Sequence, residues 1–339
     1  MSDGTETSAA KMRFRGKSAE QPLAPVEDEH TGITFELVEH YKVITGKQIA
    51  PSETLKHLAQ SDVKIYGEQS AESQESHARD ALEMSRLAPE ELKLPMLFHD
   101  IGKAGPDYNN PPLSKLTSKM YAYNFPYHEM GKTTQETPVE EFLEAMINQE
   151  EQLRDASKEA KEKFIEKLKK MLNLKEGASM RDFYDAHIKW GVELQEKNHF
   201  IDKPTAFAAI GHHILPGIMP RDMRAIQNGE KKMGKGIVPL IQDFTPLPID
   251  VKLAAGAQTL DFCNARFTRS KDGVDAAVEQ TREALFFAID NGGYDNLVSQ
   301  YEQLGVEIKL TKEDIAEIKE YIVHILETYR EAIRMHRGV

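Results

Sequence analysis

Helical periodicity is the sequence feature that most restricts how this chain can fold. Beyond about residue 30, apolar residues recur every three or four positions, and few stretches alternate apolar and polar residues as a strand does. In the segment ESQESHARDALEMSRLA, this spacing puts His77, Ala81, Met84 and Ala88 on one face of a helix. We therefore predict an all-α fold.

Composition narrows the class of protein. The chain has 339 residues, 40% of them hydrophobic, which is enough to bury a sizeable core. Its 43 basic and 55 acidic residues leave a formal charge of −12, which argues against non-specific binding to nucleic acid. An anionic substrate would need a local cationic pocket or metal ions.

Cysteine usage and hydropathy indicate the compartment. Cys263 is the only cysteine, so the chain can form neither an intramolecular disulfide nor a thiolate zinc site, as expected in a reducing compartment. No stretch approaches the roughly 18 apolar residues of a membrane span. We expect a cytoplasmic protein with no membrane partner.

The chain divides into a tail and one helical domain. Residues 1–30 are polar and favour a disordered tail, and residues 31–339 form the predicted domain. Within that domain, residues from about 139 to 200 are highly charged, with apolar residues at helical intervals, and predict a solvated helical insertion. Residues from about 228 to 250 are rich in Gly, Lys and Pro and predict a long loop.

The last predicted helix begins near Thr311. Its apolar stripe consists of Ile315, Ile318, Ile322 and Ile325. Such a stripe packs either on the body of the same chain or on a second subunit, and the first arrangement is the more common. The sequence therefore leaves open whether the protein forms a homodimer.

Residues of the types that bind metals occur at intervals along the chain, each in or beside a separate predicted helix. They are His77, His99, Asp100, His128, His212, His213 and Asp261. Taken singly, each histidine is more often an ordinary core or surface residue. Asp261, however, shares a helix face with Ala254, Ala257 and Leu260, where a carboxylate is costly unless it is paired or bound to a metal.

Imidazole nitrogen and carboxylate oxygen suit first-row divalent metals, and a carboxylate can bridge two of them. Two such ions can bind a transferring phosphoryl group while lowering the pKa of water. The ordered set therefore points to metal-assisted hydrolysis. The other histidines have no place in this order and are interpreted as ordinary helix or surface residues: His30, His40, His57, His187, His199, His324 and His336.

In chain order, the set resembles the HD-domain metallohydrolases, whose helices supply a histidine, an HD pair, later histidines and a final aspartate. The motifs HDIGK at 99–103, HEMG at 128–131 and HH at 212–213 are most similar to the HD-GYP branch. The resemblance covers roughly residues 70–135 and 203–270, on either side of the charged insertion. It implies an HD-type helical bundle, extended by the insertion and by the C-terminal helices.

The resemblance also implies a pair of divalent ions, with iron or manganese favoured. One ion would be held by His77, His99, Asp100 and Asp261. Asp100 would bridge to a second ion held by His128, His212 and His213. Lys103 would lie near the substrate phosphate, and Arg221 and Arg224 would contact phosphate.

The implied activity is that of a phosphohydrolase acting on a nucleotide or cyclic dinucleotide through a metal-activated hydroxide. Two departures from the branch bear on this. The stretch ILPGIMPRDMR follows the paired histidines where the branch carries ExxDGxGYP, and Ser73 stands where members with three metals carry a glutamate. Two alternatives stay open, namely a di-iron oxygenase of the same superfamily and a non-catalytic metal-binding sensor or interaction protein.

Overall fold

The computed structural model describes residues 39–47, 77–105, 117, 120, 136–149, 156–269 and 273–337. Within these ranges the all-α prediction is confirmed, and the β-type pairing there is limited to an isolated antiparallel bridge between Pro138 and Ser179. The predicted tail at 1–30, Ser73 and His128 lie outside the described residues.

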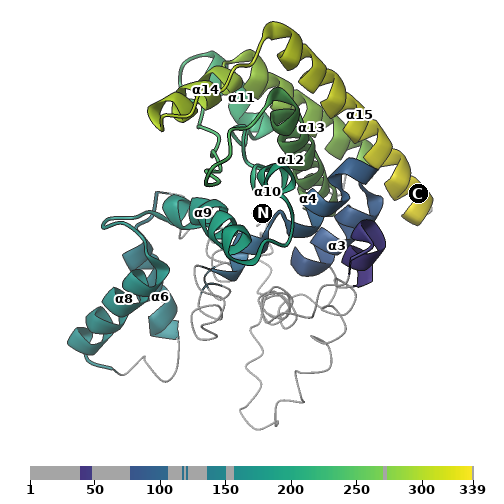
Figure 1. Cartoon of the computed structure of the whole chain (residues 1–339). Helices are drawn as coiled ribbons and strands as arrows, with labels where there is room; N and C mark the ends of the chain where they lie inside the picture. The colour runs from purple at the N-terminus through teal and green to yellow at the C-terminus, as the bar shows by residue number, and fades with distance from the viewer. Residues whose placement is uncertain are drawn as a thin grey trace, which may run out of the picture.

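Figure 1 shows how the helices are arranged. After a short helix at 39–45, the first half of the chain contains α3 (His77–Leu87), the 3₁₀ turn η1 (Glu90–Leu92), α4 (Lys93–Phe98), the 3₁₀ turn η2 (Ile101–Ala104), α6 (Val139–Gln149) and α8 (Lys158–Leu172). The second half contains α9 (Met180–Asn198), α10 (Lys203–Ile210), α11 (Pro220–Gln227), α12 (Pro248–Arg269), α13 (Gly273–Asp290), α14 (Gly293–Gln303) and α15 (Lys312–Arg337).

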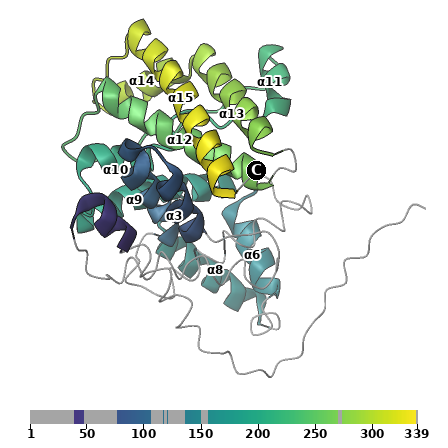
Figure 2. The same cartoon turned by 90° about the vertical axis from the view of Figure 1, so that its right-hand side faces the viewer.

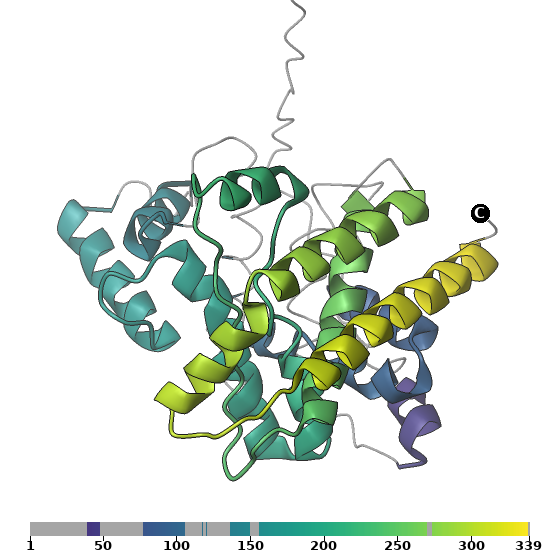
Figure 3. The ribbon, with the colours of Figure 1, turned by 90° about the horizontal axis from the view of Figure 1, so that it is seen from above.

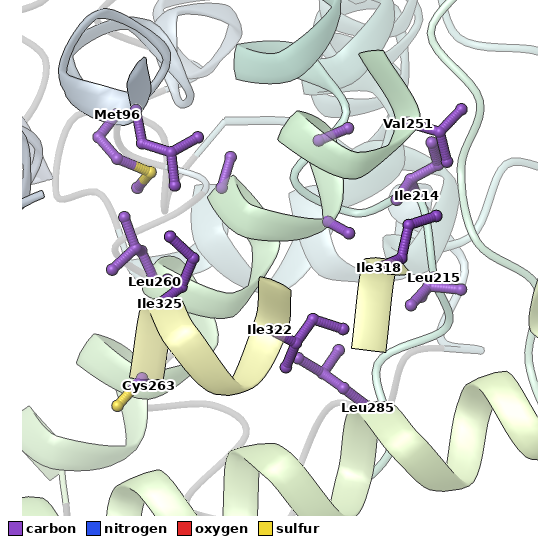
Figure 4. Close-up of a cluster of buried hydrophobic side chains, with 14 of the residues drawn as sticks. Met96, Ile214, Leu215, Val251, Leu260, Cys263, Leu285, Ile318, Ile322 and Ile325 are labelled. Atoms are coloured by element: carbon purple, nitrogen blue, oxygen red, sulfur yellow. The ribbon is translucent and has the colours of Figure 1, made fainter. Parts of the chain in front are cut away.

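The main hydrophobic core forms where α12 meets α4, α10, α13 and α15. Ile318, Ile322 and Ile325 of α15 are at most 1% exposed, and Figure 4 shows them among side chains that include Leu260 and Cys263 of α12. The C-terminal stripe therefore packs on the body of the chain, and Figure 2 shows α15 crossing α12. None of the described helices is long and apolar enough to cross a membrane.

The short helix α10 is the centre of this arrangement. The Asp202 side chain caps its N-terminus by accepting a hydrogen bond from the Thr205 amide at 2.9 Å, and Pro204 occupies its first turn, where no amide donor is needed. Residues 206–210 are all buried, and three of them are alanines. Small side chains allow close packing, so α10 contacts α4, α9 and α12 at once.

The charged segment forms a hairpin with a core of its own. Helix α6 packs against α8 and against α9, and side chains of all three helices share one hydrophobic cluster. Figures 1 and 3 show α6 and α8 on the opposite side of the molecule from α15. We call this second cluster the hairpin core; its central residues include Phe142, Leu143, Leu172 and Phe183. The charged residues of α8 lie on its outer side in pairs such as Lys163 with Glu159 at 2.7 Å.

Helix α9 belongs to both cores. Phe183 and Trp190 pack in the hairpin core, whereas Ile188 and Val192 pack in the main core. A capping box of Ser179 and Asp182 fixes where this helix begins.

Gly102 allows η2 to lie directly on the backbone of α9. A Cβ atom at this position would lie 1.8 Å from the His187 carbonyl oxygen and 2.6 Å from the Gly191 nitrogen. Because the backbone of α9 cannot yield as a flexible side chain can, only glycine fits here without displacing α9.

We predict that Gly102→Ala destabilises the protein by about 1–3 kcal/mol, the usual range for overpacking a tight contact. Gly191→Ala is the matched control, because a Cβ there would meet its nearest neighbour, Ile210 Cγ1, at an ordinary 3.4 Å. Alanine also has the higher helix propensity, so the control should be neutral or more stable. Urea unfolding of both variants measures the difference, and equal stabilities would show that the close approach of η2 to α9 is wrong.

Candidate metal centre

Six imidazole and carboxylate side chains from four separate segments meet beside the contact between η2 and α9. We call them the His–Asp cluster; they are His99, Asp100, His187, His212, His213 and Asp261. The HD pair follows α4, His187 lies on α9, the paired histidines follow α10, and Asp261 lies on α12. The packing of α10 against α4, α9 and α12 brings these four segments together.

Asp100 lies between the two halves of the cluster. Its Oδ2 atom is 3.4 Å from His99 Nε2, and its Oδ1 atom is 3.4 Å from His212 Nε2 and 3.9 Å from His187 Nε2. On the first side, His99 Nε2 is also 3.7 Å from Asp261 Oδ1. The two carboxylate oxygens of Asp100 therefore face different sets of side chains.

Three histidines of the cluster are oriented in the same way. His99 Nδ1 is 2.8 Å from the carbonyl oxygen of Met96, and His212 Nδ1 is 2.8 Å from that of Ala209. His187 Nδ1 makes the same contact with the Tyr184 carbonyl, also three residues earlier. A carbonyl oxygen only accepts, so Nδ1 carries the proton in each ring and the Nε2 lone pair of the neutral form faces the cluster.

The negative charge of Asp100 is balanced by neighbouring groups. Burial opposes ionisation of this carboxyl, but the Lys103 cation, together with His99 and His212 when their Nε2 atoms carry a proton, outweighs burial and holds the pKa of Asp100 well below its usual range. The Lys103 ammonium lies 2.5 Å from Asp100 Oδ2. Asp100 is therefore a carboxylate at neutral pH.

The pKa values of two histidines, His187 and His213, are shifted so that the neutral imidazole is favoured. Burial, reinforced by His212, lowers the pKa of His187 to about 3. Burial together with His212 and His187 also lowers the pKa of His213 well below its ordinary value. Neutral imidazole is the form that binds metals, so these two rings need no deprotonation at pH 7.

The donor set fits divalent ions of the first transition row. His187, His212 and His213 each offer a nitrogen, and the three nitrogens lie within 4.8 Å of one another. His99, Asp100 and Asp261 offer one nitrogen and two carboxylates on the other side. The hydrogen bonds from Nδ1 to carbonyl oxygens are the outer contacts that orient imidazole ligands in metal sites.

The side chains in and beside the cluster are not equally buried. Side chains of Asp261 and Lys103 are 22% and 19% exposed, whereas those of His99 and His212 are 2% and 1% exposed. Asp261 and Lys103 are thus more exposed than His99 and His212, and His213 is half-buried.

The sequence analysis interpreted His187 as an ordinary helix or surface residue, whereas the structure places its ring beside the paired histidines. The side chain is 4% exposed and belongs to the cluster. A signal was present, because Phe183, His187, Trp190 and Leu194 share one apolar face of a charged helix. The same pattern singles out His77 in the sequence.

The remaining predicted site residues are not joined to the cluster in the described part of the chain. His77 is the first residue of α3, and its side chain falls outside what the structure describes, as His128 does entirely. Arg221 and Arg224 are exposed on α11, which packs on α13, and no hydrogen bond or ion pair among the described residues links them to the cluster. Their contact with phosphate stays a prediction.

Comparisons with models of known protein families, with curated proteins and with solved structures found no match.

We predict that His187→Ala lowers the amount of divalent metal bound per chain, because one imidazole of a three-nitrogen set is lost. His324→Ala, a change at an exposed histidine on α15, is the control and should bind as much metal as the wild type. Elemental analysis after dialysis against Mn²⁺ or Fe²⁺ measures the ratio. Equal metal content in the two variants would exclude His187 as a ligand.

Proposed function

We propose that the chain is a metal-dependent phosphohydrolase that hydrolyses a phosphate ester of a nucleotide or cyclic dinucleotide. The observation that carries this proposal is the convergence of four imidazoles and two carboxylates around Asp100, with the Nε2 atoms of three histidines directed inward. A hydrophobic core has no need of such a group. The proposal agrees with the resemblance of HDIGK and HH to the HD-domain motifs.

The cluster offers two neighbouring sets of ligands. His99 and Asp261 would hold one ion and His187, His212 and His213 the other, with Asp100 shared between them. Divalent ions bound there would supply Lewis acidity toward a phosphoryl group and lower the pKa of water. In the net reaction, water adds to phosphorus, the ester P–O bond breaks and the leaving oxygen takes up a proton.

Lys103 adds a positive charge beside the cluster, which would favour binding of a phosphate group. Its ammonium pairs with Asp100 Oδ2, and the Lys103 side chain remains partly exposed. A cation held there by an ion pair would stabilise the negative charge that develops on phosphoryl oxygens in the transition state. With a formal charge of −12 on the chain, such local positive charge is what an anionic substrate requires.

The histidine-rich composition of the cluster also favours a second candidate. Four histidines and two aspartates suit iron as well as manganese, so a di-iron oxygenase uses the same ligands. Lys103 beside the shared carboxylate favours the hydrolase. Oxygen consumption with an organic phosphonate or a polyol, without hydrolysis of a phosphodiester, would support the oxygenase, and metal binding with neither activity would indicate a sensor.

We predict that Asp100→Ala abolishes both metal binding and hydrolysis of bis(p-nitrophenyl) phosphate, because each half of the cluster loses its shared carboxylate. Circular dichroism should show a helical content close to that of the wild type. Hydrolysis by a metal-depleted Asp100→Ala protein at the wild-type rate would refute the proposed site.

We predict that Lys103→Ala retains bound metal but lowers kcat by roughly 100-fold, as expected for loss of a group that stabilises the transition state. Lys93→Ala is the matched control, because Lys93 pairs with Glu90 at 2.5 Å on the surface, where ion pairs contribute little. Metal content and kcat are measured on the same samples. Loss of metal in the Lys103 variant would mean that the lysine supports the ligands rather than the substrate.

A further inference from the structure

The loop that carries His212 and His213 is bound to α12 by two side chains on either side of Asp261. Gln258 lies three residues before Asp261, and Arg266 lies five residues after it. Gln258 bonds the backbone of Leu215, and one Arg266 nitrogen donates to the Ile218 carbonyl at 3.2 Å.

Gln258 makes the tighter of the two connections. Its Oε1 accepts from the Leu215 amide at 2.9 Å, and its Nε2 donates to the Leu215 carbonyl at 2.7 Å. Both residues are at most 1% exposed, so water does not compete for these bonds. The amide of glutamine is suited to this role because it presents one acceptor and a donor side by side, as a neighbouring strand would.

The opposite side of the same loop is fixed by backbone contacts. The Ile237 amide donates to the His213 carbonyl at 2.8 Å. Gly236 lies so close that a Cβ there would be 1.8 Å from the Ile214 carbonyl oxygen. Residues 213–215 are therefore held between the 228–247 segment and Gln258, and Gln258 is the side chain that ties them to the helix of Asp261.

We propose that Gln258 is a positioning residue of the metal centre, which sets the distance between Asp261 on α12 and the paired histidines. This inference rests on the proposed function insofar as it assumes that the His–Asp cluster binds metal. The Nδ1 bond to Ala209 orients the His212 ring, and Gln258 holds the backbone from which the pair of rings projects. Outer contacts of this kind change metal affinity by roughly 10–100-fold when they are removed.

The test is titration of the metal-free full-length protein with Co²⁺, followed by visible absorption, which reports both affinity and coordination. Gln258→Met retains the length of the side chain and removes both hydrogen bonds. We expect it to weaken Co²⁺ binding by roughly 10–100-fold and to alter the absorption bands.

Thr259→Val is the matched control. Thr259 is the next residue of α12, is equally buried, and its hydroxyl donates to the Ala255 carbonyl of its own helix at 2.7 Å. It should bind Co²⁺ as the wild type does. Should Gln258→Met fail to fold, Gln258→Glu keeps the acceptor for the Leu215 amide, loses the donor to the Leu215 carbonyl and is expected to bind Co²⁺ more weakly than the wild type.

The outcomes separate the two proposals. Wild-type Co²⁺ affinity and spectrum in the folded Gln258 variant, or equal losses in the Gln258 and Thr259 variants, would overturn the positioning role even if the wild type hydrolyses bis(p-nitrophenyl) phosphate. Conversely, a selective loss in the Gln258 variant, together with no hydrolysis by the wild type, supports positioning and refutes the proposed activity. Absence of Co²⁺ binding by the wild type would overturn both.

Discussion

The surrounding structure depends on the interactions that stabilise the buried carboxylate of Asp100. A charge taken out of water is costly unless opposite charges and hydrogen-bond donors replace the water. Lys103 supplies the opposite charge one turn away, and imidazoles from Asp100's own segment (His99) and from two other segments (His187 and His212) complete the surroundings. These side chains can surround Asp100 only if the ends of α4 and α10 and the middle of α9 lie close together. The packing of these helices is therefore what makes the buried charge possible.

Much of this arrangement could be predicted from the sequence. Helical spacing alone leads to the all-α fold, because the apolar pattern is long and regular. His99, Asp100, His212, His213 and Asp261 can be selected because they are residue types that bind metals and lie in or beside separate predicted helices, Asp261 on an apolar face. Their order along the chain then relates them to one another.

His187 shows where sequence reasoning fails. The sequence shows that His187 lies on an apolar helix face. However, His187 follows a long charged segment that predicts a solvent-exposed insertion, so the sequence gives no indication that His187 lies close to Asp100. That closeness depends on Gly102 lying on the backbone of α9, a tertiary contact between residues 85 positions apart or more. Gln258 was hidden for a related reason, since a glutamine in a helix is ordinary until its partner, Leu215, is known.

Two levels of organisation therefore surround the cluster. Three of the four imidazole rings, those of His99, His187 and His212, are oriented locally, each by a carbonyl one turn earlier on its own segment. The segments are aligned by contacts between distant parts of the chain, of which the Gly102 approach and the Gln258 bonds are the clearest. Local orientation is inherent in helical geometry, whereas alignment requires the whole fold, which explains why the ligand types are easier to infer than their arrangement.

The sharing of α9 between two cores has a thermodynamic consequence. A ligand that binds His187 binds only the folded form of α9, and the first half of that helix is folded against α6 and α8. By mass action, ligand binding would then stabilise the distant hairpin as well as the site. Reciprocally, a partner that binds the outer surface of α6 and α8 and stabilises the fold of α9 would raise the affinity at His187, so the charged hairpin and the cluster would be thermodynamically linked.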